Sequence, residues 1–187
     1  MTDHFHRKTC KRYDVPGDVH ELTFSCFKRR QFLIYGRTRQ YFGEAVIKAR
    51  EKHRFDLWAY VVMPEHVHLL IWPREDNYSI SKILNTIKQS VSRRVLIYVR
   101  KHKLPTLKLM ATGQKDRPYR FWLDGGGYDR NITSLKVLSS VFDYIHNNPV
   151  ERGLVATTGD WEYSSAAEWE GSRESPIPID KGSFPVL

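Results

Sequence analysis

The clearest chemical signal in this 187-residue sequence is a pair of histidines, His66 and His68, separated by one valine. They begin an apolar run typical of a buried strand, and residues two apart on a strand project from the same face of the sheet. Two neutral imidazoles on one face can bind a divalent metal ion. The same spacing also arises incidentally in strands, so this pattern alone leaves both interpretations open.

Tyr144 is the second candidate for chemistry. The helical period places it on a flank of an apolar stripe, with Asn148 one turn later on the same flank. A tyrosine hydroxyl can attack as a nucleophile and form a covalent intermediate. A tyrosine in this position can equally cover the core with its ring and hydrogen-bond through its hydroxyl, so position alone does not decide between the two roles.

A third signal is Phe121-Trp122, which precedes a run of three glycines, residues 125–127. Aromatic rings beside flexible backbone can stack on exposed bases. Aromatic residues as apolar as these more often fill a hydrophobic core, and we therefore expect Trp122 to be structural. The other rings on which a base could stack are those of Tyr78, Tyr98 and Tyr128.

The positive charge is concentrated in one segment. The formal net charge is +9, and residues 77–115 contain nine basic residues and no acidic one, while the rest of the chain is balanced. A concentrated basic surface favours a polyanionic partner, most often nucleic acid, over a solvated helix with no partner. The basic residues that we expect to contact nucleic acid are Lys82, Lys88, Arg93, Arg94, Arg100, Lys101 and Lys103.

The hydrophobic pattern predicts the elements that position these residues. Apolar alternation and apolar runs predict strands over residues 18–27, 55–63, 66–72 and 128–132, and helical spacing predicts helices over residues 37–53, 80–101 and 134–148. This order favours a single-domain α+β fold, a ferredoxin-like antiparallel sheet with helices packed on it.

The sequence also predicts how two of the helices begin and end. Ser79 can cap the helix that starts at Ile80. Pro149 should end the last helix at Asn148, because proline disfavours helical geometry in the residue before it. The buried stripe of that last helix should comprise Leu135, Leu138, Phe142 and Ile145.

Composition excludes several classes of protein. Two cysteines form neither a disulfide framework nor a four-cysteine zinc site, and Cys26, within an apolar alternation, should be buried. No apolar run approaches the length of a membrane span, and basic residues interrupt the N-terminus, so we expect a cytoplasmic protein without a signal peptide. We expect one domain, residues 13–167, between an N-terminal tail (residues 1–12) and a C-terminal tail over the surface (residues 168–187).

Two long motifs resemble those of the single-tyrosine HUH transposases, specifically the branch called REP-associated tyrosine transposases. The first, residues 61–71, contains the histidine pair, and the second, residues 144–155, begins Tyr-Ile-His-Asn-Asn-Pro. Between them, Phe121-Trp122 and Tyr128-Asp129 resemble the family's linking segment. The alternating first strand and the Trp-Glu-Tyr-Ser-Ser stretch that starts at Trp161 fit the family's two ends, so the resemblance covers residues 13–167.

The resemblance implies a hairpin-specific enzyme that cuts and rejoins single-stranded DNA. His66 and His68 would bind Mg²⁺ or Mn²⁺, Asn148 would be the third protein ligand, and Tyr144 would be the nucleophile. The tyrosine would join the 5′ phosphate and release a 3′ hydroxyl. The partner would be a DNA hairpin beside a short single-stranded guide sequence, and the protein would act as a monomer or a homodimer.

Three features depart from the family's usual pattern. Glu65 stands where an asparagine most often precedes the first histidine, Arg130 stands where many relatives have a histidine, and the glycine run 125–127 is unusual. None of these departures removes a catalytic group. Two other functions stay open: a domesticated, non-catalytic binder of hairpin DNA or RNA, and a metal-dependent hydrolytic nuclease in which water attacks and Tyr144 is structural.

Overall fold

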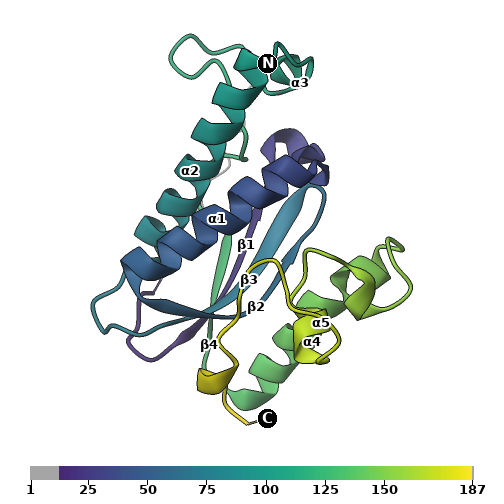
Figure 1. Cartoon of the computed structure of the whole chain (residues 1–187). Helices are drawn as coiled ribbons and strands as arrows, with labels where there is room; N and C mark the ends of the chain where they lie inside the picture. The colour runs from purple at the N-terminus through teal and green to yellow at the C-terminus, as the bar shows by residue number, and fades with distance from the viewer. Residues whose placement is uncertain (1–12, 187) are drawn as a thin grey trace, which may run out of the picture.

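The structure, a computed structural model, describes residues 13–186. Its centre is an antiparallel sheet of strand order β2-β3-β1-β4, formed by β1 (Val19–Ser25), β2 (Phe55–Val62), β3 (His66–Pro73) and β4 (Tyr128–Ile132). One face is covered by α1 (Gly36–His53) and α2 (Ile80–Lys101), and the other by α4 (Leu135–Glu151), as Figure 1 shows. The expected ferredoxin-like α+β fold is confirmed. The expected N-terminal tail, residues 1–12, lies outside the described residues.

The sheet has a hydrophobic core on each face. On one side, α1 and α2 pack against Leu22 and Phe24 of β1 and Val67 of β3. On the other side, α4 packs Leu138 and Ile145 against the remaining sheet residues. β2 is buried along its whole length, and β3 nearly so, which is why their sequences read as continuous apolar runs rather than as alternation.

Two expectations about helix ends are corrected. Ser79 occupies the N-cap position of α2, but its side chain accepts no capping hydrogen bond. The Asp14 carboxylate takes over that role and accepts from the backbone N–H of Ile80 at 3.3 Å. Leu135, expected in the buried stripe of α4, is 57% exposed, because the first turn of α4 precedes the part of the helix that packs on the sheet.

The prediction that Pro149 ends α4 at Asn148 is wrong. The helix continues to Glu151 with Pro149 inside it. Proline removes one backbone donor, but the hydrogen-bonded ladder resumes where the N–H of Arg152 donates to the carbonyl of Asn148 at 3.1 Å. Asn148 and Pro149 are both buried, so packing of this last turn outweighs the local preference against helix.

The residues after α5 (Ala166–Trp169) pack on the body of the domain. Ile177 is fully buried in the core beneath α1, and the Asp180 carboxylate accepts from the backbone N–H of Leu57 at 2.8 Å. A segment expected to cover only the surface therefore also contributes to the core.

Four short 3-10 helices and α3 complete the described structure: Phe27–Arg29, Phe32–Ile34, Thr106–Leu109 (α3), Thr158–Asp160 and Lys181–Ser183. Among the described helices, none combines the length and the apolar character that crossing a membrane requires.

Candidate active site

The candidate site lies on the sheet face that α4 covers. On β3, Val67 and Leu69 point into the core beneath α1 and α2, so His66 and His68 point toward α4. The antiparallel register pairs His68 with Thr23 and His66 with Ser25 of β1. The polar residues of β1 therefore form a row beside the histidine pair, while the apolar residues between them face the opposite core.

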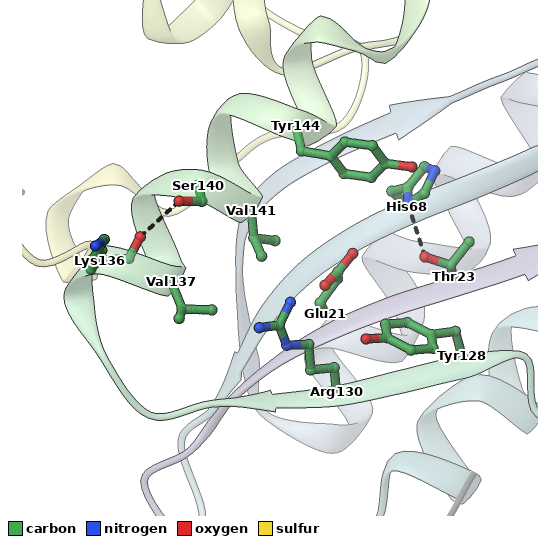
Figure 2. A pocket seen from close by; sticks show the side chains of 10 residues that line it. All are labelled: Glu21, Thr23, His68, Tyr128, Arg130, Lys136, Val137, Ser140, Val141 and Tyr144. Atoms are coloured by element: carbon green, nitrogen blue, oxygen red, sulfur yellow. Dashed lines mark hydrogen bonds between the residues drawn. The ribbon is translucent and has the colours of Figure 1, made fainter. Parts of the chain in front are cut away.

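The four residues expected to carry chemistry are brought together, although they come from a strand and a helix far apart in the sequence. The ring centres of His66 and His68 are 4.9 Å apart, and the Tyr144 ring stands perpendicular to that of His68 at 5.3 Å. Asn148 donates its amide N–H to Nε2 of His68 at 3.5 Å. Tyr144 is 43% exposed and directs its hydroxyl toward His68 (Figure 2).

Neighbouring side chains fix both imidazoles in one orientation. Since Nε2 of His68 accepts from Asn148, its Nδ1 carries the proton and donates to the Thr23 hydroxyl at 2.8 Å. Nδ1 of His66 donates to the Glu65 carboxylate at 3.1 Å, and Arg152 donates to the same carboxylate oxygen at 2.5 Å. In each histidine the outer contact holds Nδ1–H, so Nε2 is the nitrogen that can bind a ligand. In His68 a ligand on Nε2 would replace the 3.5 Å contact from the Asn148 amide.

Burial keeps both imidazoles neutral. It lowers the pKa of His68 to about 3, with a smaller contribution from neighbouring His66. Burial also lowers the pKa of His66, and the opposing effect of Glu65 is smaller. At neutral pH both side chains are therefore uncharged, which is the form that binds a metal ion.

The donor set fits a divalent ion. The side-chain oxygen of Asn148 is buried and has no hydrogen-bond partner, so it is a free acceptor beside the two imidazoles. Within residues 13–186, no group of three His, Cys, Asp or Glu side chains is arranged to hold a metal. The set present is instead two imidazole nitrogens and one amide oxygen, all neutral, with space left for other ligands.

Two pockets meet at Tyr144. One has a volume of about 350 Å³ and contains both histidines, and the other is about 600 Å³ and extends toward β4. Both are bounded by Thr23, His68 and Tyr144, so the tyrosine stands between them.

Sequence reasoning did not identify several residues that line the two pockets. The polar positions Glu21, Thr23 and Ser25 alternate with the apolar residues of β1, and that alternation was a usable signal for a polar sheet face. The basic residues at the pockets carried no such signal, because they come from four separate segments: Arg29, Arg130, Lys136 and Arg152.

The basic residues expected to bind nucleic acid belong to α2 and its end, on the opposite face of the sheet (Figure 1). Three have partners within the protein: Arg94 pairs with Glu44, Arg100 lies over the Tyr119 ring, and Lys88 donates to backbone carbonyls of the glycine-rich loop. The exposed ones are Lys82, Arg93, Arg100, Lys101 and Lys103. The structure does not bring this group to the histidine pair.

The aromatic pair Phe121-Trp122 is structural, as expected for Trp122. Phe121 is 1% exposed and Trp122 is 5% exposed, and both belong to the core beneath α1 and α2. Of the three tyrosines considered for base stacking, Tyr78 is engaged by His20 and Tyr98 packs on His102. Tyr128 is 49% exposed and lines the larger of the two pockets.

Comparison with known proteins agrees with the motifs. Residues 20–148 match a family model described as "Transposase IS200 like". The chain is 28% identical over 159 residues to the REP-associated tyrosine transposase of Escherichia coli, a match that covers 83% of this chain and 80% of the relative. A related protein of Haemophilus influenzae is 29% identical over 142 residues, which cover 71% of this chain and 75% of that protein.

The fold is similar to that of a REP-associated tyrosine transposase solved with a REP hairpin bound. The TM-score is 0.68 at 20% identity, and the match covers 96% of this chain and 99% of the other. The resemblance drawn from the two motifs is thus confirmed. The family model matches well over half of the length of this chain, and the chain therefore belongs to the IS200-like transposases.

Proposed function

We propose that this chain cuts single-stranded DNA beside a hairpin and transfers the cut strand, with Tyr144 as the nucleophile. His66, His68 and Asn148 would hold the Mg²⁺ or Mn²⁺ ion. The observation that carries the proposal is the convergence at His68, whose ring is contacted by Tyr144 and whose Nε2 accepts from Asn148. If Tyr144 only covered the core, there would be no need for the amide oxygen of Asn148 to lie buried, without a hydrogen-bond partner, beside two neutral imidazoles.

The ligand set suits a negatively charged substrate. A divalent ion held here would neutralise the charge on the non-bridging oxygens of a phosphodiester and so assist nucleophilic attack. Because imidazole and amide ligands are neutral, they leave the ion's positive charge undiminished. Imidazole nitrogen binds first-row transition metals, Mn²⁺ included, more readily than it binds the harder Mg²⁺, so we expect Mn²⁺ to support activity at lower concentration than Mg²⁺.

The proposed step exchanges one ester for another. The Tyr144 oxygen attacks phosphorus, its proton is released, and the bond from phosphorus to the 3′ oxygen breaks, so that the 3′ oxygen leaves as a hydroxyl. The 5′ phosphate stays attached to the tyrosine as a reactive ester. A 3′ hydroxyl from another strand can reverse the reaction and restore the tyrosine, so that joining requires no ATP.

Hairpin DNA is the substrate that the family resemblance favours, since the similar solved structure is of a transposase bound to a REP hairpin. The DNA backbone would be held by exposed basic residues of α2. Val99, near the end of α2, lines one pocket together with Phe32. The next residue, Leu33, donates its N–H to the carbonyl of Pro64, two residues before His66. The end of α2 therefore lies at the same end of the sheet as His66. Arg29, at the mouth of the smaller active-site pocket, would link the two surfaces.

The test is covalent capture. The protein is mixed with Mn²⁺ and labelled single-stranded hairpin DNA from the flanks of its own gene, and a denaturing gel reveals any protein–DNA adduct. We expect an adduct with the 5′-phosphate fragment that is lost in Tyr144→Phe and in His66→Ala. Tyr35→Phe is the matched control, because Tyr35 is also exposed but lies away from both active-site pockets.

The other outcomes identify the rival functions. DNA cleavage that survives Tyr144→Phe would mean that water is the nucleophile and that the protein is a hydrolytic nuclease. Tight hairpin binding without cleavage, in the presence of either metal ion, would mean that the protein is a non-catalytic binder.

A further inference from the structure

The larger of the two pockets at Tyr144 extends away from the histidine pair. It has a volume of about 600 Å³ and lies between β1 and β4 on one side and the first half of α4 on the other (Figure 2). None of the roles assigned above to the histidines, Asn148 or Tyr144 requires a cavity of this size on the β4 side. Acidic, basic, aromatic and apolar side chains all line this pocket. They include the acidic Glu21, the basic Arg130 and Lys136, the aromatic Tyr128, and the apolar Val137 and Val141.

Glu21 is the unusual member of this lining. It is only 6% exposed, yet its carboxylate points into the pocket and accepts no hydrogen bond from any other side chain drawn there (Figure 2). Arg130 is its partner across β1 and β4 in the strand register, but no ion pair joins the two side chains. Burial raises the pKa of the Glu21 carboxyl, and the charge of Arg130 offsets this only in part.

Among the described residues, the Glu21 carboxylate is not one of the fully buried groups that lack a partner, so its oxygens are accessible from the pocket that it lines. A carboxylate confined in this way loses part of its hydration, and a ligand that donates hydrogen bonds can replace what is lost. Such a group is retained where it has a ligand to bind, and a cleft beside reactive groups is the usual place. The carboxylate offers two acceptor oxygens, so its natural partner is a ligand group rich in N–H donors.

The remaining walls indicate the rest of that ligand. The exposed ring of Tyr128 can stack on a flat ring, and Val137 and Val141 provide an apolar surface on the opposite side. Arg130 and Lys136 are exposed cations that can contact a phosphate. A flat ring with N–H donors that is attached to phosphate is a nucleotide.

We propose that this pocket binds the base of a nucleotide next to the phosphate that is cut, and that Glu21 accepts a hydrogen bond from an amino group on that base. The proposal deepens the function proposed above and rests on it. Guanine, adenine and cytosine each carry an exocyclic amino group with two N–H donors. Thymine has only the N3–H, and the carbonyl oxygens on either side of it repel a carboxylate. Glu21 is therefore a specificity-determining residue that disfavours thymine at one position.

The spacing along β1 fits a neighbouring nucleotide. Glu21 and Thr23 are two residues apart on the same face, which is a distance of about 7 Å along a strand. Thr23 contacts His68 directly, so the Glu21 carboxylate lies one step along the sheet from the candidate metal ligands. A nucleotide adjoining the reacting phosphate can reach the Glu21 carboxylate, whereas a distant part of the hairpin cannot.

The test is a selection that needs no cleavage. Hairpin DNA with a randomised single-stranded extension is bound to the full chain carrying Tyr144→Phe, and the bound fraction is sequenced. We expect one position of the extension to be depleted of thymine by about 10-fold. Adding Glu21→Gln should abolish the depletion at that position alone, because an amide can donate to a thymine carbonyl. Glu21→Asp should retain the order of preference, and Glu51→Gln, an exposed residue of α1, is the control.

Thermal unfolding separates recognition from a structural role. Because burial disfavours the charged form of Glu21, Glu21→Gln removes a partly desolvated charge, and its melting temperature should equal or exceed that of the parent protein. A clear loss of stability would mean that Glu21 supports the fold and would overturn the inference, as would an unchanged base preference in Glu21→Gln. Base selection without any covalent adduct in the wild-type protein would contradict the proposed cleavage, and with it the placement beside a cut phosphate, while supporting base recognition by Glu21.

Discussion

At the scale of single residues, the orientation of His66 depends on a chain of contacts that ends at the surface. Glu65 accepts from His66 and from Arg152, and Arg152 follows directly after α4. The Glu65 carboxylate is therefore held by a cation that stands directly after the helix carrying Tyr144. Outer contacts of this kind hold a metal-binding imidazole in the correct tautomer.

We predict that Arg152→Met weakens metal use more than it weakens the fold. Loss of the cation removes one of the two donors that hold the Glu65 carboxylate, so that the carboxylate can turn away from His66. The Mn²⁺ concentration that gives half-maximal adduct formation should rise by roughly 10- to 100-fold. A Mn²⁺ titration of the covalent-capture reaction measures this, with Arg173→Met, a surface arginine that donates to a backbone carbonyl, as control. An unchanged Mn²⁺ requirement would show that Arg152 does not act through His66.

The residues that converge in the candidate site could be singled out from sequence because each stands in a local pattern. His66 and His68 have strand spacing, and Tyr144 and Asn148 are one helical turn apart. Their outer partners could not be predicted in the same way. The contact between Thr23 and His68 depends on the register of β1 against β3, and the reach of Arg152 to Glu65 depends on where the end of α4 lies over the sheet.

At the scale of elements, β4 depends on one glycine. Gly127 has a φ of +75°, and a side chain there would place its Cβ 2.1 Å from the carbonyl oxygen of Thr23. It lies immediately before Tyr128, the first residue of β4, so it sets how closely the chain approaches β1. The glycine run was recognisable as a bend, but the close approach to β1 was not visible in the sequence.

We predict that Gly127→Ala destabilises the protein by about 2 to 4 kcal/mol, because backbone strain and a clash with β1 add together. The melting temperature should fall by roughly 5 to 15 °C. Gly113→Ala is the matched control, since Gly113 has a φ of +79° but nothing within 4 Å of the added carbon, and it should show the strain alone. Equal losses in the two variants, measured by thermal unfolding, would rule out the clash.

The boundaries of the main elements were largely predictable, because each buries a face with a clear period. Local rules failed where tertiary contacts compete with them. Pro149 remains helical because its turn is buried, and Ser79 does not cap α2 because Asp14, far away in sequence, supplies the acceptor. Ile177 gave no periodic signal, since a single apolar residue in an irregular segment fits a surface tail as well as a core.

At the scale of the whole molecule, the basic surface and the candidate active site lie on opposite faces of the sheet. The charge count indicated a polyanion, but only the fold shows that α2 and the histidine pair are separated by the sheet. Lys101 and Lys103 stand at the end of α2 nearest to the start of β3, whereas Lys82 stands at the other end, near His53. DNA that contacts both surfaces must pass over the edge between them.

We predict that neutralising Lys101 and Lys103 together weakens hairpin binding without changing base preference. If each lysine contacts one phosphate, the slope of log affinity against log salt should become shallower by about 1.5. Binding measured over a series of salt concentrations tests this, with the double variant Lys48→Gln and Lys52→Gln on the exposed side of α1 as control. A slope equal to that of the wild type would mean that the DNA follows another path.

Tyr144 and Asn148 stand one turn apart on α4, whereas the histidine pair belongs to the sheet. A helix moves as a stiff rod, so any displacement of α4 would withdraw the proposed nucleophile and the proposed third metal ligand in a single motion. With the roles that we propose, the protein could not keep all three metal ligands in place while the nucleophile is displaced, nor keep the nucleophile in place beside an incomplete metal site. Contacts that change the position of this one helix would therefore switch the proposed activity on or off as a unit and would protect DNA from partial, unproductive cutting.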